Sequence, residues 1–179
     1  MQAIEPLRRL GKPYGEHMGS QPYTAWQQAF DPLLAPGARN YWKSHNFTEL
    51  SDGAIAALTT AAGQLPSDEC EIFVALVAGA ANRVPADATA YVGRDTRLVI
   101  NVHARWQDAA ADEACIAWAR AFYAAAQPFA TGGGYVNFMT ADEAARVPSA
   151  YGANYARLVE TKRRFDPDNV FHANQNIAP

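Results

Sequence analysis

The chain holds few residues whose types and spacing are suited to catalysis or ligand binding. Its four histidines, His17, His45, His103 and His172, are scattered, and none pairs with another histidine or a cysteine at a spacing typical of metal ligands. His103 is the histidine of most interest, because it lies beside Asn101 on the polar side of an alternating segment. That placement sets His103 apart from the other three histidines, for which a structural role is favoured.

Common catalytic and cofactor motifs are missing from the sequence. It contains no GxGxxG, no Walker loop, no HExxH and no CxxC, which argues against dinucleotide, triphosphate and zinc chemistry. The run Gly132-Gly133-Gly134 precedes an expected strand rather than a helix, so it predicts a plain turn. Cys70 and Cys115 have apolar neighbours, which favours buried, inert thiols over a disulfide or a reactive cysteine.

A β-strand over residues 97–106 is expected to position Asn101 and His103. The even-numbered residues from Leu98 to Trp106 are all apolar, whereas the opposite face carries Val99, Asn101, His103 and Arg105. This period of two predicts that one face packs on a core and that the other faces water, a ligand or another protein layer.

The remaining pattern predicts an α+β fold, a mostly antiparallel sheet with helices packed on one face. Further strands are expected over 39–47, 71–78, 88–93 and 135–139, with 88–93 joined to 97–106 as an antiparallel pair. Helices are expected over 23–30, 52–65, 108–127 and 151–165. Prolines and glycines divide residues 1–38 too finely for long elements, so this segment is expected to be a connecting arm.

Length and composition limit the classes of function. The 179 residues, 49% of them hydrophobic and 18% charged, predict one domain or slightly more with a true core. A formal net charge of −3 without a basic face argues against nucleic-acid binding. Since no apolar run approaches a membrane span or a signal peptide, we expect a cytoplasmic protein without membrane contact.

The last 45 residues carry an ordered string of motifs. These are Tyr135-Val136-Asn137-Phe138, Tyr151-Gly152, Asn154-Tyr155, Arg157-Leu158, Lys162, Phe165-Asp166-Pro167-Asp168-Asn169-Val170-Phe171, Asn174-Gln175-Asn176-Ile177 and Pro179. The string resembles the closing signature of berberine-bridge-enzyme-like FAD-linked oxidases. Upstream, Tyr41-Trp42-Lys43-Ser44, Asp87-Ala88-Thr89-Ala90 leading to Arg94, and Trp106 also resemble the second half of that family, so the resemblance covers essentially the whole chain.

The resemblance implies the substrate domain of a two-domain flavoprotein, with a substrate-domain portion over 39–134 and a berberine-bridge-like C-terminal motif over 135–179. In such enzymes an antiparallel sheet roofs the flavin, and hydride passes to FAD from a C–H bond of a small-molecule substrate next to oxygen or nitrogen. The same resemblance makes Tyr135 the candidate catalytic phenol and places Asn101 or His103 near a catalytic or substrate-orienting position.

Three side-chain amides are candidates for contacts with FAD or its domain, namely Asn137, Asn174 and Gln175, since an amide offers both donors and an acceptor. The alternative is that they satisfy exposed backbone groups. Tyr41 and Lys43 are expected either to line the substrate side of the roof or, preferably, to cover the edge of the sheet.

Two departures from the family pattern open a second hypothesis. Phe138 stands where many members have a tyrosine, and a phenyl ring accepts no proton. The FAD-binding half is also outside the chain, so we expect FAD to bind weakly or not at all without an FAD-binding domain or polypeptide. The alternative hypothesis is a catalytically silent binding or assembly module. In either case an uncovered roof face predicts a homodimer or higher oligomer.

Overall fold

The computed structural model describes residues 4–11 and 19–179, and the chain divides into two compact units, residues 1–36 and 37–179. The first unit contains the short helices α1 (Glu5–Arg8) and α2 (Tyr23–Gln28) and the 3-10 turn η2 (Asp31–Leu34). Pro6 and Pro32 are the second residues of α1 and η2, and Pro22 directly precedes α2, positions at which the start of a helix tolerates proline. His17 and part of the expected connecting arm over 1–38 lie outside the described residues.

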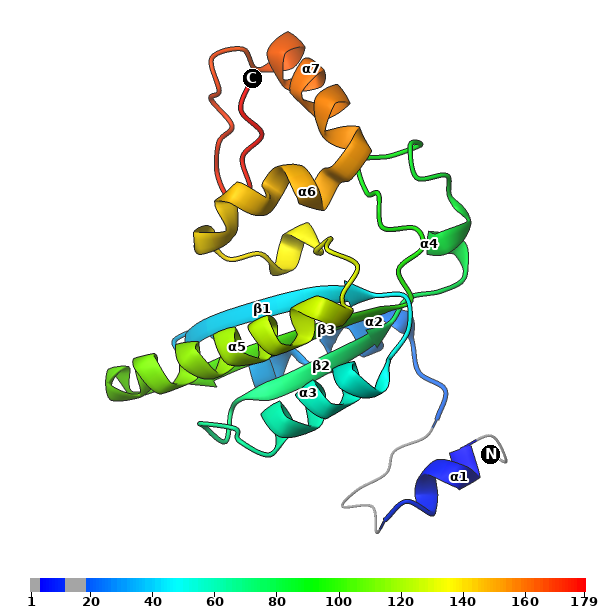
Figure 1. Ribbon diagram of the computed structural model, residues 1–179, viewed down its shortest axis with the longest axis vertical. Coiled ribbons are helices and arrows are strands. Elements are labelled where there is room, and N and C mark those ends of the chain that lie inside the picture. The colour runs from blue at the N-terminus through cyan, green and yellow to red at the C-terminus, as the bar shows by residue number, and fades with distance from the viewer. Residues whose placement is uncertain (1–3, 12–18) are drawn as a thin grey trace. The chain divides into compact units, whose positions relative to one another are not determined.

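Three antiparallel strands form the sheet of the second unit (Figure 1). They are β1 (Arg39–Phe47), β2 (Glu71–Leu76) and β3 (Leu98–Trp106), in the spatial order β1-β3-β2. The register pairs His103 with Trp42 on one side and with Glu71 on the other. The central strand is therefore the one that carries the alternating pattern.

Two helices, α3 (Asp52–Ala62) and α5 (Asp112–Ala126), pack on one face of this sheet (Figure 1). Ser51 caps the first, because its hydroxyl accepts a hydrogen bond from the backbone N–H of Ala54 at 3.3 Å. We call this side of the sheet the helical face and the other side the open face. The core on the helical face is formed by Phe47, Ala54, Ala61, Cys70, Ile100, Val102, Ala104, Trp106, Cys115, Trp118, Ala119, Phe122 and Ala126. The predicted α+β class, with helices on one face of an antiparallel sheet, is confirmed.

Short helices fill the connections and the C-terminal part of the second unit. They are α4 (Ala80–Arg83), η3 (Ala109–Ala111), η4 (Gln127–Phe129), η5 (Val136–Phe138), η6 (Ala141–Arg146), α6 (Val147–Tyr151), η7 (Gly152–Asn154) and α7 (Tyr155–Phe165). Both cysteines are buried free thiols on the helical face.

Two predicted strands are wrong. Residues 88–93 form a loop, and β3 pairs with β1 and β2 instead. The loop is fixed by side chains: Asn154 donates to the carbonyls of Ala86 and Thr89, and Arg94 donates to the hydroxyl of Thr89. Residues 135–139 contain the 3-10 turn η5, since the N–H of Phe138 bonds the carbonyl three residues back.

The tail after α7 also differs from expectation in one respect. Asp166 ends the helix in the expected turn, and its carboxylate accepts hydrogen bonds from the backbone N–H groups of Val170 and Phe171 at 2.7 and 3.0 Å. The side chain of Phe171, expected to point inward as an anchor, is 81% exposed. Because the Asp166 carboxylate binds the backbone of residues 170 and 171, the turn folds back onto the end of α7 and the Phe171 ring stays exposed.

Candidate functional site

A cavity of about 430 Å3 lies on the open face of the sheet. It is framed by the open-face residues of β2 and β3, by the loop before β3 and by η5. We call it the aromatic cavity, because four aromatic rings line it; the lining residues are Phe73, Ala75, Val77, Ala81, Tyr91, Arg94, Val99, Tyr135 and Phe138. Mostly apolar walls with a few polar groups are typical of small-molecule sites.

Tyr135 contributes the phenolic hydroxyl of this cavity. Its oxygen accepts a hydrogen bond from Asn137 Nδ2 at 2.8 Å, which fixes where the hydroxyl can point. Its ring packs edge-to-face against Phe138, with centroids 5.1 Å apart, and against Tyr91 at 6.4 Å. Phe138 therefore adds an apolar wall beside Tyr135 and no second hydroxyl.

Asn101 and His103 both lie on the open face, as the alternation predicted, but both are buried, with exposed fractions of 6% and 4%. Asn101 is the cross-strand partner of Phe73 and shares its face with Val99, two residues that line the aromatic cavity. Its side-chain oxygen is buried without a hydrogen-bond partner among the residues described. An orphaned acceptor of this kind is costly unless a donor from outside completes it.

His103 is engaged on both ring nitrogens. Nδ1 lies 3.2 Å from Glu71 Oε1 and Nε2 lies 2.9 Å from Asn40 Oδ1. Arg105 adjoins this group, with a bond of 2.9 Å to Glu69. The geometry thus ties His103 across all three strands.

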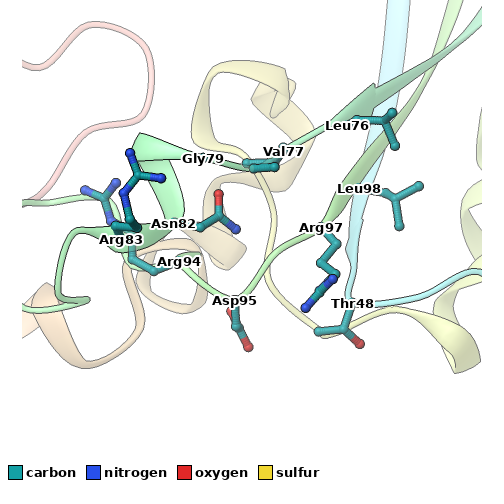
Figure 2. Close-up of a pocket in the computed structure, with 11 residues that line it drawn as sticks. Thr48, Leu76, Val77, Gly79, Asn82, Arg83, Arg94, Asp95, Arg97 and Leu98 are labelled. Atoms are coloured by element: carbon teal, nitrogen blue, oxygen red, sulfur yellow. The ribbon is translucent and has the colours of Figure 1, made fainter. Parts of the chain in front are cut away.

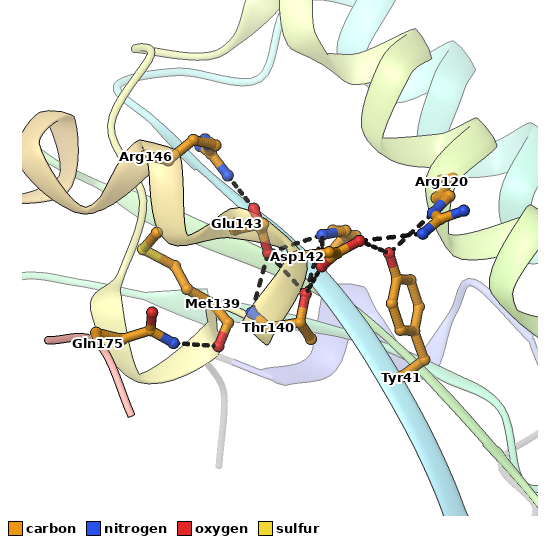
Figure 3. Close-up of polar contacts among 9 residues, drawn as sticks. Tyr41, Arg120, Met139, Thr140, Asp142, Glu143, Arg146 and Gln175 are labelled. Carbon is orange, nitrogen blue, oxygen red and sulfur yellow. Dashed lines mark hydrogen bonds and ion pairs between the residues drawn. The ribbon is translucent and has the colours of Figure 1, made fainter. Parts of the chain in front are cut away.

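The three candidate amides are placed differently from one another. Asn137 is exposed and donates a hydrogen bond to Tyr135, one of the residues that line the aromatic cavity. Gln175 donates to the carbonyl of Met139 at 2.8 Å (Figure 3), which anchors the tail just after η5. Asn174 is exposed with a left-handed backbone, φ 58°. The structure therefore brings Tyr135 and Asn137 together, and Gln175 satisfies a backbone carbonyl.

A polar cluster on the helical face joins β1 to η6 and α5 (Figure 3). Lys43 lies at its centre: Nζ is 2.8 Å from Asp142 Oδ1 and 3.0 Å from Glu143 Oε2. Asp142 also accepts from the Tyr41 hydroxyl at 2.7 Å and from Arg120 at 3.1 Å. We call these residues, with Thr140 and Arg146, the Lys43 cluster.

The electrostatics of the Lys43 cluster follow from its burial and its partners. Burial raises the pKa of Asp142, but hydrogen bonds from Lys43, Thr140, Tyr41 and Arg120 outweigh it and hold that pKa well below the ordinary value. Burial lowers the pKa of Lys43, but its hydrogen bonds to Asp142 and Glu143 raise it by more, so the pKa lies above its ordinary value. The cluster is therefore a set of paired charges that fixes η6, and with it the segment carrying Tyr135, against β1.

Sequence reasoning missed most of the cavity walls. Tyr91 was expected within a strand and Arg94 directly after it, whereas the loop that they form places both on the wall of the aromatic cavity. Tyr41 and Lys43 lie on the helical face of the edge strand β1, which agrees with the interpretation that they cover the sheet edge.

No helix among the described residues has both the length and the apolar character that crossing a bilayer requires. Within the same residues no group of three or more histidine, cysteine or acidic side chains is placed to hold a metal ion.

The fold matches about a third of the chain of enzymes related to berberine bridge enzyme. The crystal structure of an aclacinomycin oxidoreductase matches with a TM-score of 0.68 at 26% identity, covering 79% of this chain and 32% of that one. Berberine bridge enzyme from Eschscholzia californica matches with a TM-score of 0.71 at 23% identity, covering 79% and 33%.

Sequence comparison agrees with the structural match. Residues 134–178 match the family described as "Berberine and berberine like". An uncharacterized FAD-linked oxidoreductase of Bacillus subtilis, YvdP, is 31% identical over 187 residues, covering 100% of this chain and 41% of that protein. Residues 134–178 thus match the berberine-like family, as the C-terminal motifs predicted, and the chain spans about 41% of the length of that relative.

Proposed function

We propose that this chain supplies the substrate-domain part of an FAD-dependent oxidoreductase that oxidises a C–H bond next to oxygen or nitrogen. The observation that carries the proposal is the aromatic cavity on the open face, which combines apolar walls with the Tyr135 hydroxyl. In the proposed enzyme the flavin-binding domain comes from a polypeptide segment outside these 179 residues and closes over the open face.

The residues of the open face fit a flavin ring. The buried oxygen of Asn101 lacks a donor within the described chain, and a flavin ring offers an N–H group that can supply one. Asn137 and Asn174 are exposed amides that can meet the cofactor or its domain. When bound, FAD supplies the two-electron acceptor that no side chain of this protein provides.

Tyr135 is the residue we assign to proton handling. Asn137 donates to its oxygen, so the hydroxyl is held in one orientation at the cavity wall. Phe73, Tyr91 and Phe138 exclude water and hold a planar substrate against it. His103, with both nitrogens engaged, is assigned to positioning β1, β2 and β3, and Asn101 to orienting the flavin or the substrate.

One observation favours a second candidate, a catalytically silent binding or assembly module. Phe138 lines the aromatic cavity beside Tyr135, so a tyrosine hydroxyl at that position in relatives is missing from the cavity here. If that hydroxyl is indispensable, the cavity retains binding without turnover.

Reconstitution separates the two candidates. The chain is purified and mixed with FAD, alone and together with an FAD-binding-domain polypeptide from a relative, and flavin absorption that co-elutes with the chain is measured by gel filtration. Co-elution of flavin, followed by bleaching on addition of a C–H donor substrate, supports the oxidoreductase. Loss of bleaching in Tyr135→Phe, with Tyr155→Phe as the matched control outside the cavity, supports the role of Tyr135. A folded, monodisperse chain that never co-elutes with flavin refutes the oxidoreductase and leaves the silent module.

A further inference from the structure

A second cavity, of about 890 Å3, adjoins the aromatic cavity. The two cavities share the lining residues Val77 and Arg94, so they meet at the start of the loop between β2 and β3. The second cavity extends from there to the end of β1, where Thr48 lies (Figure 2). We call it the arginine cavity.

Positive charge is in excess along the arginine cavity. Three arginines line it, Arg83, Arg94 and Arg97, against the single carboxylate of Asp95 (Figure 2). This contrasts with the formal net charge of −3 for the whole chain. Across the described part of the chain, the guanidinium groups of Arg83 and Arg97 have no ion pair or hydrogen bond, so their donors are available to a ligand.

Arg94 stands between the two cavities and is held rigidly. Its Nη1 donates to the carbonyl of Ala81 at 2.7 Å, its Nη2 donates to the Thr89 hydroxyl at 2.6 Å, and its guanidinium lies 4.8 Å from the centroid of the Tyr91 ring. Nε is buried and has no partner within the described residues. A fixed guanidinium with an unsatisfied N–H is a prepared site for an acceptor oxygen.

We propose that the protein binds an elongated ligand with two chemically distinct ends. A planar ring system occupies the aromatic cavity, and a carboxylate or phosphate group carried by the same molecule binds along the arginine cavity, past Arg94. The proposal rests on the proposed function, because it names the substrate class of that site: ring compounds with an acidic group are preferred over their neutral counterparts. Arg83 and Arg97 act as specificity residues and take no part in the oxidation.

The proposal is tested on the 179-residue chain itself, without flavin or partner. The probes are 2-naphthoxyacetate and its neutral counterpart 2-(2-naphthoxy)ethanol, and their dissociation constants are measured by isothermal titration calorimetry. We expect the acid to bind about tenfold more tightly than the alcohol. The two probes bury the same ring, and only the acid adds charge-assisted hydrogen bonds to the guanidinium groups. Raising the salt concentration reduces the difference.

The decisive variant is Arg83→Gln/Arg97→Gln, because neither guanidinium group has a hydrogen bond or ion pair with the described residues that the substitution would remove. We expect the preference for the acid to fall to about twofold or less, while the affinity for the alcohol stays unchanged. Arg157→Gln/Arg163→Gln removes the same charge from exposed positions of α7 and keeps the preference. Phe73→Ala weakens both probes by similar factors, since it removes a wall of the ring site.

Three results overturn the proposal: equal affinity of the two probes, no binding of either, or equal loss of preference in both double variants. These results are independent of flavin reconstitution. If the acid preference is found and FAD never co-elutes, the proposed oxidoreductase fails and the two-ended ligand site stands. If FAD co-elutes and the preference is missing, only the inference about the ligand fails.

Discussion

Replacing Asp142 by asparagine is expected to loosen the C-terminal segment from the sheet. The carboxylate binds Lys43 on β1, Tyr41 on the same strand and Arg120 on α5, so one side chain joins three elements. An asparagine keeps one acceptor oxygen and places an NH2 donor toward these donors. The perturbation therefore acts on charge and hydrogen bonding while nearly preserving volume.

The magnitude follows from the burial of the partners. The Lys43 side chain is 6% exposed, so its charge-assisted bond is in the class worth about 1.5–3 kcal/mol. Arg120 is 58% exposed, which limits its ion pair to about 0.2–1 kcal/mol. Since Glu143 still neutralises Lys43 at 3.0 Å, the expected loss is about 2 kcal/mol in the free energy of unfolding, or about 4–8 °C in Tm.

The pH dependence gives a second measure of the same interaction. The pKa of Asp142 is lower in the folded chain than its ordinary value of 3.8, so its contribution is fully present above that value and is lost as the pH falls through the folded pKa. Urea unfolding followed by tryptophan fluorescence is compared between wild type and Asp142→Asn at pH 7 and at pH 3. The difference in the free energy of unfolding between wild type and Asp142→Asn is expected to be largest at pH 7 and to narrow only below about pH 4.

The matched control is Asp68→Asn, an exposed aspartate without a hydrogen bond or ion pair among the described residues. It is expected to change the free energy of unfolding by less than about 0.5 kcal/mol. Equal stability losses in the two variants at pH 7 would refute the assignment of Asp142 as the link between β1, α5 and η6.

Three further predictions concern the core and its caps. Burial lowers the pKa of His45, which is stacked 4.1 Å from the Tyr123 ring, so the unfolded chain takes up the proton first and stability falls as the pH drops below 6.5. His45→Phe should flatten that part of a urea-midpoint profile, and an unchanged slope would contradict the assignment. Ser51→Ala should lower the free energy of unfolding by about 1 kcal/mol, measured by thermal unfolding, whereas Ser51→Asp should keep most of the wild-type stability. Burial and the neighbouring Cys70 raise the pKa of Cys115 to about 11, so Ellman's reagent at pH 8 should find the thiols unreactive until denaturant is added; rapid reaction of the native protein would argue against a closed core.

Strong periodicity made the sheet and its helices predictable from sequence. The strand over 39–47 has the observed bounds of β1, and the alternation over 97–106 correctly separated the helical face from the open face. The helix expected over 52–65 ends at Ala62, three residues early, near Gly63. In these segments local pattern and tertiary packing favour the same structure.

The two wrong strands show what local pattern omits. Residues 88–93 look like a strand, yet Asn154, more than 60 residues away in the sequence, binds the backbone carbonyls of Ala86 and Thr89 and fixes this segment as a loop. No window of neighbouring residues contains that information. The same holds for the site. Tyr135, Asn137 and Asn101 could be identified from motif and alternation. Tyr91 and Arg94 line the aromatic cavity only because of the loop that Asn154 holds, so the sequence did not identify them.

The order of the strands also affects how the protein behaves at high concentration. With β3 in the centre, β2 is paired on one side only within residues 37–179, and its Phe73 and Leu76 side chains are 48% and 83% exposed. An open sheet border with apolar side chains is a template on which a strand of another molecule can add by backbone pairing. Leu76→Lys would disfavour the addition of a strand from a second molecule at β2. It would therefore distinguish self-association through this border from self-association through the open face.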